Sequence, residues 1–489
     1  MASPGDERPF PPGDYPVVVV GSGPGGLQAS YCLSRLGVDH AVISRDEGPG
    51  GMFRRCPIFQ RLLSWSKPDA PAEPGTRAYE WYDHNSLLAE EPEHQAVVPA
   101  LMDRAYMVPS RDEMERGLGA FAERVPVSIR YGCTWERTRR EDDGRLVLTT
   151  SDGEYRCRAA VFAIGVTTPW LSPIPGIEDV PHYVDTRTPA DYRGRRVFVL
   201  GKRNSGFEIA DGLLPWASQI ILGSPRPVQT AVIAQASVRA RYLQPYEDAA
   251  LGGGTFVLDL SVERIERTER GWRIVGSGTT RPGAFDLEVD DVIAATGFST
   301  PLLDLGDLGV RTVAQGRIPA LTPFWESERG SGIYFAGNTT QGAAGLRKHG
   351  VGSASPAVHG FRYNARVMAR RLAETHLGIT PRRERVDRSA LVPYLLEELT
   401  TAPELWTQKS YLARTVTLEG ESDIVPLAHF VDASGPDAVA VTVEMNASGE
   451  TYPAVYVRRG GEIAERLLPP SLTNNFRGPE HERELRAVL

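Results

Sequence analysis

The sequence predicts an α/β fold of two nested Rossmann-like dinucleotide-binding domains, followed by a C-terminal α+β extension. A strand, a glycine-rich loop, a helix and a second strand follow one another from Val17, and the same order begins again at Arg196. Each unit is closed by strand-like segments and an apolar strand that runs into glycine. Residues 332–338 then return to a buried strand. The second dinucleotide fold is therefore predicted to lie within the sequence of the first.

The composition is typical of a soluble globular protein. The 489-residue chain is 41% hydrophobic and 24% charged, enough for two or three cores. Its formal net charge of −8 argues against a non-specific nucleic-acid binder, because such proteins need a basic surface. No run approaches the roughly 18 apolar residues of a membrane span. Residues 1–14 lack an apolar signal core and are predicted to be a disordered lead-in, so we expect a cytoplasmic protein.

The cysteines and histidines form no recognisable redox or metal pattern. The four cysteines contain no C-x-x-C pair, which excludes the commonest arrangement of a redox disulfide. The nine histidines are dispersed and show no zinc spacing. We therefore predict structural thiols and no metal site. The cysteines are Cys32, Cys56, Cys133 and Cys157.

The first glycine-rich loop has the features of a phosphate-binding turn. Gly21 permits the tight turn, Gly23 lets the backbone approach a pyrophosphate, and Gly26 lets the helix pack closely on the strand. The helix that begins around Pro24 supplies free N–H groups and the positive end of its dipole, which favour phosphate. In this strand–turn–helix–strand context the motif predicts dinucleotide binding.

The segment after the second strand contains the candidates for the ribose contact. A dinucleotide fold usually ends this strand with an acidic residue that holds the ribose hydroxyls. Here Ser44 stands at that position and is followed by Arg45. A serine hydroxyl can bond a ribose, and Asp46 or Glu47 is an alternative partner. The glycines at 50–51 predict a loop whose backbone lies close to a cofactor.

Residues 54–68 are too polar for a core and too apolar for a solvent-exposed loop. Bulky apolar residues alternate there with Ser64, Ser66 and Lys67. We favour a lining for a flat aromatic ring, because ligand pockets are mostly apolar with a few placed polar groups. A surface helix with its cap is the alternative.

The second glycine-rich loop predicts a nicotinamide dinucleotide site that prefers NADPH. It spans residues 201–206, and Arg203 replaces the middle glycine. The strand after it is followed by Ser224 and by no acidic residue that would hold a 2′-hydroxyl. Lys202, Arg203 and Arg226 instead suit the extra 2′-phosphate of NADPH. The alternative is that these cations are solvated surface residues.

These features resemble the two-dinucleotide-binding-domain flavoproteins and, within them, the class B flavin monooxygenases. The resemblance rests on the nested folds, the A-x-G and A-T-G strand ends, and a returning strand that ends in A-G-N. Among the flavin-containing monooxygenase-like proteins, the chain looks most like the FAD-dependent oxidoreductase domain-containing type. That likeness spans roughly residues 15–430 and rests on LLSWSKP, YDHNSLL, RAYMVPSRDEM, GKRNSGFEIAD, LRKHG and HGFRYNARVMARRL.

The resemblance implies FAD on the first fold and NADPH on the inserted one. It places the FAD pyrophosphate at the first glycine loop and the adenosine ribose at Ser44 and Arg45. The residues implied near the isoalloxazine are Gly51, Met52, Phe53 and Lys67. Those implied at the ribityl–pyrophosphate side are Gly337 and Asn338. The residues implied to hold the pyrophosphate of the nicotinamide cofactor are Gly201, Asn204, Ser205 and Gly206.

The resemblance also implies the reaction. It indicates an FAD- and NADPH-dependent monooxygenase that oxidises a small molecule with molecular oxygen through a flavin C4a-hydroperoxide. Soft or basic nucleophiles suit such a peroxide, so N-hydroxylation of an amino-bearing metabolite is the leading prediction. S-oxygenation, Baeyer–Villiger oxygenation, a pyridine-nucleotide-dependent flavin reductase or oxidase, and a non-catalytic partner-binding flavoprotein are the alternatives.

Two segments supply the candidate catalytic residues. Ser64 or Ser66 stands where the class has an asparagine near the flavin, and Lys67 follows. A cationic loop is predicted to bind an anionic substrate or a cofactor phosphate, with an exposed basic loop as the alternative. Its residues are Arg347, Lys348 and His349.

The predicted division of the chain follows from these motifs. It is a lead-in at 1–14, an FAD-binding domain at 15–165 and 299–378, an inserted NADPH-binding domain at 166–298, and an extension at 379–489. A helix is expected from about Ser355 to Leu377, with Pro356 in its first turn. The extension carries no motif with assignable chemistry. We expect a cap over the site or a dimerisation element, which would make the protein a homodimer.

Overall fold

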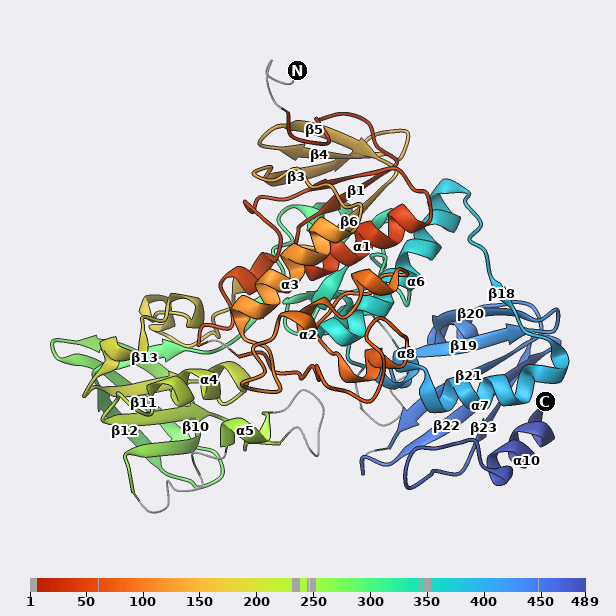
Figure 1. The fold of residues 1–489 in the computed structure, drawn as a ribbon. Helices are drawn as coiled ribbons and strands as arrows, with labels where there is room; N and C mark the ends of the chain where they lie inside the picture. Colours follow the sequence, from red (N-terminus) through yellow and green to blue (C-terminus); the bar gives the residue numbers. More distant parts are fainter. Residues whose placement is uncertain are drawn as a thin grey trace. The chain divides into compact units, whose positions relative to one another are not determined.

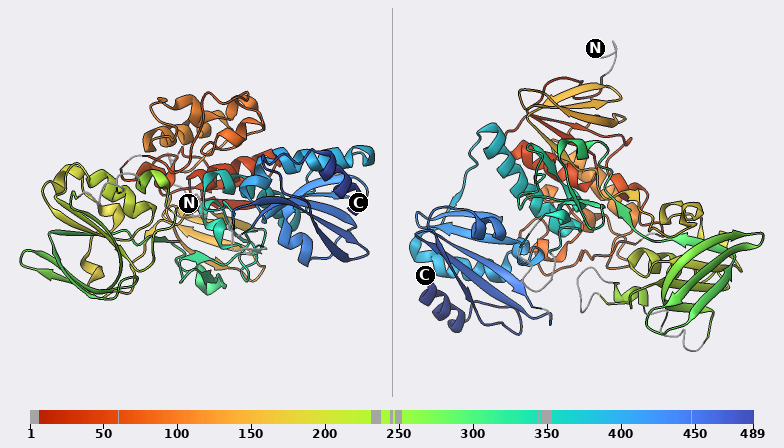
Figure 2. Two further views of the ribbon diagram at one scale, coloured as in Figure 1. Left: turned by 90° about the horizontal axis from the view of Figure 1, so that it is seen from below. Right: turned by 180° about the vertical axis from the view of Figure 1, so that it is seen from behind.

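The chain forms two compact units. The structure, a computed structural model, describes residues 7–59, 61–230, 238–243, 246, 252–343, 345, 353–446 and 448–489 (Figures 1 and 2). The first unit contains Met1–Arg54, Ser64–Val166 and Thr300–Leu489, and the second contains Arg55–Leu63 and Thr167–Ser299. Within the described ranges, no helix is both long and apolar enough to cross a membrane.

A four-stranded parallel sheet forms the centre of the first unit (Figure 1). Its order is β17-β6-β1-β2, and Val17 pairs with His40 on one side and with Ala159 on the other. The valines at 17–20 are at most 5% exposed, because both faces of the sheet are covered. The fold class predicted from the sequence is confirmed here. The strands are β1 (Val17–Val20), β2 (His40–Ile43), β6 (Ala159–Phe162) and β17 (Ile333–Phe335).

Four helices belong to this part of the first unit. They are α1 (Pro24–Arg35), α2 (Val97–Leu101), α3 (Arg111–Arg124) and α6 (Val358–Leu377). Helices α1 and α6 pack against each other, and α2 packs against α3. Helix α6 begins later than predicted, with Ala357 as its N-cap, so Pro356 is not in its first turn. The residues before the helix form a turn closed by the hydrogen bond from Ala357 N–H to Ala354 O at 2.9 Å, and the buried Ser355 hydroxyl accepts a hydrogen bond from Asn364 Nδ2 at 3.0 Å.

An antiparallel sheet of β3, β4 and β5 accompanies the central sheet. Trp135 of β3 packs on Phe162 of β6, with ring centroids 4.8 Å apart. The residues before Tyr15 pack here too: Arg8 forms a 3.0 Å ion pair with Asp152, and Tyr155 Oη donates to Phe10 O at 2.7 Å. The expected disordered lead-in is therefore corrected for residues 8–14, and residues 1–6 lie outside the described ranges. The strands are β3 (Trp135–Arg140), β4 (Leu146–Thr150) and β5 (Gly153–Cys157).

The second unit contains one six-stranded mixed sheet in the order β12-β11-β10-β9-β8-β13. Strands β8, β9, β13 and the first part of β10 are parallel, and β10, β11 and β12 continue as antiparallel hairpins. Separate apolar cores lie on the two faces of the sheet. The strands are β8 (Arg196–Leu200), β9 (Gln219–Ser224), β10 (Thr255–Thr268), β11 (Gly271–Gly278), β12 (Ala284–Val289) and β13 (Asp291–Ala294). The helices are α4 (Asn204–Leu213) and α5 (Ala240–Leu243).

The boundaries of the second unit agree with those predicted for the insert, except for one additional segment. Thr167–Ser299 compares with the expected 166–298, and Arg55–Leu63 also belongs to this unit. The backbone N–H of Phe59 donates to Glu208 Oε1 at 2.8 Å, and Tyr183 Oη donates to Glu208 Oε2 at 2.5 Å. None of the described residues between 55 and 68 is helical, so the alternative of a surface helix there is wrong.

The C-terminal extension is an α+β element, as predicted, and belongs to the first unit. Its antiparallel sheet has the order β18-β20-β19-β21-β22-β23. Leu427 and Phe430 of α9 pack on the small side chains of Ala440 and Ala454. The strands are β18 (Glu384–Arg385), β19 (Leu412–Thr417), β20 (Glu421–Pro426), β21 (Ala438–Met445), β22 (Thr451–Arg459) and β23 (Glu462–Leu467). The helices are α7 (Leu391–Thr401), α8 (Pro403–Thr407), α9 (Leu427–Asp432) and α10 (Pro479–Val488).

Four two-residue strands form two small antiparallel pairs. Strand β7 (Thr168–Pro169) pairs with β14 (Phe298–Ser299) in the second unit. Strand β15 (Thr312–Val313) pairs with β16 (Ile318–Pro319) in the first unit.

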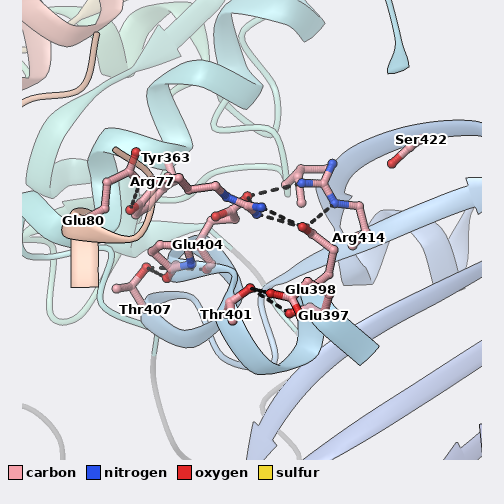
Figure 3. A network of polar contacts seen from close by, with 12 residues as sticks. Arg77, Glu80, Tyr363, Glu397, Glu398, Thr401, Glu404, Thr407, Arg414 and Ser422 are labelled. Carbon is pink, nitrogen blue, oxygen red and sulfur yellow. Dashed lines mark hydrogen bonds and ion pairs between the residues drawn. The ribbon is translucent and has the colours of Figure 1, made fainter. Parts of the chain in front are cut away.

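A buried charge network attaches the extension to the rest of the first unit (Figure 3). Arg77 donates to Glu398 at 2.6 Å and to Glu404 at 2.7 Å, and Arg414 donates to Glu398 at 2.8 Å. The side chains of Glu398 and Glu404 are only 5% and 7% exposed. Burial alone would raise the pKa of Glu398, but the hydrogen bond from Arg77 and the charge of Arg414 lower it overall. Both carboxylates therefore depend on an arginine that lies outside the extension.

Candidate functional site

Two glycine segments from distant parts of the chain meet the first glycine-rich loop. A Cβ on Gly25 would lie 2.6 Å from Gly337 Cα, and a Cβ on Gly51 would lie 2.9 Å from Gly23 Cα. Gly51 and Gly337 also have positive φ values, +55° and +81°, which favour glycine. The three segments form a cradle of bare backbone at the carboxyl ends of the strands, where parallel sheets bind their ligands.

The loop from Gly21 to Gly26 contains two glycines that the fold itself requires and one, Gly23, where a Cβ would fit. A Cβ on Gly21 would lie 2.5 Å from Ala163 O, and one on Gly26 would lie 1.9 Å from Gly21 O. A Cβ on Gly23 would make only an ordinary 3.7 Å contact. Pro24 is the first residue of α1, and the N-cap Gly23 offers no side-chain hydrogen bond to the helix. The first N–H groups of α1 are thus available to an anion.

The candidates for the ribose contact divide into a buried residue and an exposed one. Ser44 is 3% exposed, lies 2.8 Å from Ser22 Oγ and accepts a hydrogen bond from Asp46 N at 3.2 Å. Arg45 is exposed. The Ser44 hydroxyl therefore stabilises the glycine loop through its hydrogen bond with Ser22, and its role at a ribose stays a prediction.

The candidates expected near the isoalloxazine lie on two short segments of the first unit. Met52 and Phe53 belong to the 3₁₀ turn Gly51–Arg54 that follows the glycine cradle. The Lys67 ammonium lies 3.8 Å from the centroid of the Trp65 ring, so its charge rests on an aromatic face. These positions are compatible with an apolar lining, and contact with a flavin stays a prediction.

The two candidate serines differ in what they can do. Ser66 is fully buried: it donates to Asp83 Oδ1 at 2.6 Å and accepts from Asn85 Nδ2 at 3.0 Å. Its hydroxyl therefore holds two loops together, and its catalytic role stays a prediction. Ser64 is half-buried, and its carbonyl oxygen also accepts from Asn85 Nδ2 at 3.0 Å. The fold thus brings Asn85 to this segment from a distant position, which local sequence spacing did not indicate.

The returning strand places its two predicted residues differently. Gly337 contributes to the glycine cradle, as described above. Asn338 Oδ1 accepts a hydrogen bond from Val166 N at 3.1 Å, so this side chain links the strand ends on which the cradle rests. The predicted loop residues Arg347, Lys348 and His349 lie outside the described residues.

The second glycine-rich loop repeats the geometry of the first within the second unit. Gly201 has φ +134°, and a Cβ there would lie 2.5 Å from Ala295 O. A Cβ on Gly206 would lie 2.2 Å from Gly201 O. Arg203 takes the middle position with extended backbone, φ −108° and ψ −170°, which any residue adopts. The chain therefore contains two copies of one phosphate-loop geometry.

The remaining predicted residues of this loop lie at the start of α4 or at the end of β9. Asn204, Ser205 and Gly206 form the first turn of α4, and Asn204 Oδ1 accepts from Arg239 N at 3.1 Å. Ser224 is the last residue of β9, two positions before the exposed Arg226. These residues are placed as the motif requires, and their contacts with a cofactor stay predictions.

Lys202 is not a phosphate ligand at the surface. Its side chain is 1% exposed and forms an ion pair with Asp259 of β10. Hydrogen bonds from Lys202 and from Thr280 lower the pKa of Asp259. The prediction that Lys202 suits a 2′-phosphate is therefore corrected. Its partner lies 57 positions away in the sequence, so no local pattern could have revealed the pair.

All four cysteines are free thiols. Burial raises the pKa of Cys32 to about 11 and that of Cys157 to about 12, and it also raises that of Cys133. These three thiols stay protonated near neutral pH and are poor nucleophiles. Over the described residues, no cluster of histidine, cysteine and acidic side chains suits a metal ion.

Comparisons with known proteins identify relatives of this arrangement. The family described as pyridine nucleotide-disulphide oxidoreductase matches residues 18–337. FAD-dependent oxidoreductase domain-containing protein 2 of Mus musculus is 27% identical over 439 residues, which cover 82% of this chain and 64% of that protein. The chain thus spans less than two-thirds of the length of this relative.

Solved structures share the fold at low sequence identity. Bacillithiol disulfide reductase of Staphylococcus aureus matches with a TM-score of 0.57 and 14% identity, over 74% of this chain and 98% of that one. A flavin-containing monooxygenase of Stenotrophomonas maltophilia gives 0.56 and 19%, with coverages of 74% and 98%. The ornithine N-hydroxylase of Kutzneria sp. 744 gives 0.55 and 17%, with coverages of 74% and 99%. The matches show a common architecture for both reductases and monooxygenases.

Proposed function

The chain belongs to the pyridine nucleotide-disulphide oxidoreductase family, and on that premise we propose that it is an FAD- and NADPH-dependent monooxygenase. One observation carries the proposal: the glycine loops at 21–26 and 201–206 share one backbone geometry. Two such loops provide two dinucleotide sites, one for the electron donor and one for the flavin. The chain is accordingly a flavin-dependent oxidoreductase with FAD and NADP(H) as its cofactors.

The first unit offers the site that fits FAD. The bare backbone at Gly23, Gly51 and Gly337 leaves room for a pyrophosphate, and the uncapped N-terminus of α1 offers it N–H donors. Met52 and Phe53 follow this cradle directly and provide apolar surface for a ring. Bound FAD supplies hydride acceptance and oxygen activation. The chain supplies binding, orientation and exclusion of water.

The cysteines favour an oxygenase or a flavin reductase over a disulfide reductase. A disulfide reductase passes electrons through a pair of thiols, and this sequence has no C-x-x-C pair. Burial raises the pKa values of Cys32, Cys133 and Cys157, so none of them is a ready thiolate. Within a family named for disulfide chemistry, this chain has no C-x-x-C pair, and three of its four thiols are buried.

We propose an amino-bearing small molecule as the substrate and N-hydroxylation as the reaction. Oxygen activated at a flavin reacts with electron-rich atoms, and an amine nitrogen is such an atom. The likeness to an ornithine N-hydroxylase shows that this fold supports that reaction elsewhere. Arg347 and Lys348 are proposed to bind an anionic group of the substrate by charge-assisted hydrogen bonds. The C-terminal extension is proposed as a cap or a dimerisation element.

Isotope labelling tests the proposal. The purified full chain, loaded with FAD, is incubated with NADPH, labelled molecular oxygen and an amino acid, a thioether or a ketone. We expect a hydroxylamine with one labelled oxygen atom for each NADPH consumed. A labelled sulfoxide or ester would move the assignment to S- or Baeyer–Villiger oxygenation. Hydrogen peroxide in the amount of NADPH consumed, with every substrate unchanged, would identify an oxidase or reductase.

Two variants test the role of the cationic loop. Arg347→Ala and Lys348→Ala should still allow NADPH to reduce the flavin, which stopped-flow absorbance measures. Product per NADPH should fall and peroxide should rise, because a substrate that is not positioned reacts poorly. Loss of flavin reduction with normal coupling would instead assign the loop to the nicotinamide cofactor.

A further inference from the structure

A segment after β9 is anchored directly at the second glycine-rich loop. The backbone N–H of Arg239 donates to Asn204 Oδ1 at 3.1 Å. Asn204 is the first residue of α4, so this bond fixes Arg239 beside the helix terminus at which the loop ends. Helix α5 begins at Ala240 and packs against α4. Arg239 and Arg241 are thus held close to the place where a dinucleotide fold binds phosphate.

Neither Arg239 nor Arg241 forms a direct ion pair with a carboxylate among the residues that the structure describes. Arg241 donates through Nη2 to Leu62 O at 2.6 Å and to Tyr242 Oη at 3.1 Å, and its Nη1 is buried without a hydrogen-bond partner. Asp211 is the acidic residue nearest in effect: burial raises its pKa, the charge of Arg241 lowers it, and its Oδ1 is likewise buried without a hydrogen-bond partner.

Two cations held this close to each other are unfavourable unless an anion neutralises them. Burial and the charge of Arg241 both lower the pKa of Arg239, because two nearby cations repel each other and have lost hydration. Charges that have lost hydration are normally paired, so two half-buried neighbouring guanidinium groups without a direct ion pair favour an anion-binding site. Arginine suits phosphate in particular, since its planar guanidinium can donate two parallel hydrogen bonds.

We propose that Arg239, supported by the charge of Arg241, binds the pyrophosphate of the nicotinamide cofactor. This inference rests on the proposed function and deepens it. The bond from Arg239 to Asn204 places Arg239 at the N-terminus of α4, where a dinucleotide fold holds the pyrophosphate. Arg226 instead follows the end of β9, the position that faces a 2′-phosphate. The second glycine-rich loop has Arg203 in place of its middle glycine. The guanidinium of Arg239 would supply a pyrophosphate contact in place of the close backbone approach that this glycine allows.

The roles proposed for Arg239 and Arg226 predict different ligand selectivities. Calorimetric titration of the oxidised, FAD-loaded chain with NADP⁺, NAD⁺ and adenosine 2′-monophosphate measures them. Arg239→Ala should raise the dissociation constants of NADP⁺ and NAD⁺ alike, by about 10- to 100-fold for one lost charge-assisted contact. It should leave adenosine 2′-monophosphate unaffected, because that ligand has no pyrophosphate. Arg226→Ala should weaken NADP⁺ and adenosine 2′-monophosphate but not NAD⁺.

Matched variants keep the test specific. Arg239→Lys retains the charge and should fall between the wild type and Arg239→Ala, because a lysine cannot donate two parallel bonds. Arg270→Ala, at the exposed turn after β10, removes a cation elsewhere in the same unit and should change no affinity. Thermal unfolding and flavin content, measured for every variant, verify that the protein is folded.

Each other outcome contradicts a specific part of the argument. If Arg239→Ala weakens NADP⁺ alone, the residue binds the 2′-phosphate and the pyrophosphate assignment is wrong. If the wild type binds both dinucleotides and Arg239→Ala changes neither, the inference fails while the proposed function stands. If the wild type binds neither dinucleotide, the proposed function fails as well.

Discussion

The ammonium group of Lys202 is paired with the carboxylate of Asp259 inside the second unit, although Lys202 stands in a loop with the backbone geometry of a phosphate-binding turn. The pair joins the β8–α4 loop to β10. Since the Lys202 side chain is 1% exposed, its charge stabilises the unit and is not available to a ligand. Lysine in a glycine-rich loop is therefore not by itself a sign of phosphate binding.

Removing Lys202 should destabilise the second unit without changing cofactor preference. Lys202→Met leaves the Asp259 carboxylate without its main partner, which should cost on the order of 3 kcal/mol of unfolding free energy. Chemical unfolding measures this loss, and adding Asp259→Asn should recover much of it. The ratio of the NADP⁺ and NAD⁺ dissociation constants should stay at the wild-type value. A selective loss of NADP⁺ affinity would show that Lys202 reaches the 2′-phosphate after all.

Two glycines of the first loop should separate cofactor binding from folding. A side chain at Gly23 meets only ordinary contacts in the protein, so Gly23→Val should fold and lose FAD. A Cβ at Gly26 would lie 1.9 Å from Gly21 O, so Gly26→Val should fail to fold. Flavin absorbance and circular dichroism of the purified variants measure the two effects. Stoichiometric FAD in a folded Gly23→Val protein would overturn the assignment of the first loop.

The stability of the second unit should depend on pH through Asp211. Burial raises the pKa of Asp211 to about 6, above the value of roughly 3.9 for an unfolded chain. The native state therefore binds this proton more tightly, and the stabilisation, fully present below about pH 4, is lost as the pH rises through about 6. Asp211→Asn should remove this loss, which is about 1–2 kcal/mol after allowance for solvent screening.

The pH profile of the melting temperature measures the effect of Asp211. The advantage of Asp211→Asn over the wild type should grow between pH 4 and 6 and then level off. Asp142→Asn, at an exposed turn of the first unit, is the control for the loss of a charge. Parallel profiles for Asp211→Asn and the wild type would show that the Asp211 carboxyl titrates normally.

The attachment of the extension should depend on Arg77. Arg77→Met leaves Glu398 and Glu404 with Arg414 alone, and uncompensated buried carboxylates typically cost about 3–5 kcal/mol. We expect a large loss of stability and faster proteolysis in the extension. Arg104→Met breaks an ion pair whose side chains are 63% and 73% exposed, and it should cost less than about 1 kcal/mol. Equal effects of the two variants would contradict the role given to the buried network.

The sequence predicted the features that depend on neighbours along the chain. Four consecutive valines, glycines at fixed spacing and the turn at Asp143-Gly144 each specify local backbone geometry, and the corresponding strands and loops are present. The nested order of the two folds followed from the returning strand at Ile333–Phe335. Periodicity and turn chemistry are local signals, so they can be interpreted without knowledge of tertiary contacts.

The roles of individual polar side chains were not predictable in the same way. Ser66 and Lys202 both stood in promising motifs, and both are buried against carboxylates, Asp83 and Asp259, that lie far away in sequence. Conversely, Arg239 carried no motif and became a candidate only through its bond to Asn204. Whether a polar group is free for a ligand depends on its long-range partners, which a single sequence does not reveal.

The nine residues from Arg55 to Leu63 also limit how far the insert is a separable module. Phe59 and Ile58 supply the backbone donors that Glu208 and Tyr183 accept, yet they precede the insert by more than a hundred positions. In a domain made of 167–299 alone, Glu208 and Tyr183 would lose these backbone donors. The surface at Gly212, which the Phe59 ring covers, would be exposed. If this insert is moved into another protein or removed, Arg55–Leu63 must be moved or removed with it. Recombination at the boundaries of 167–299 alone would produce an incomplete domain.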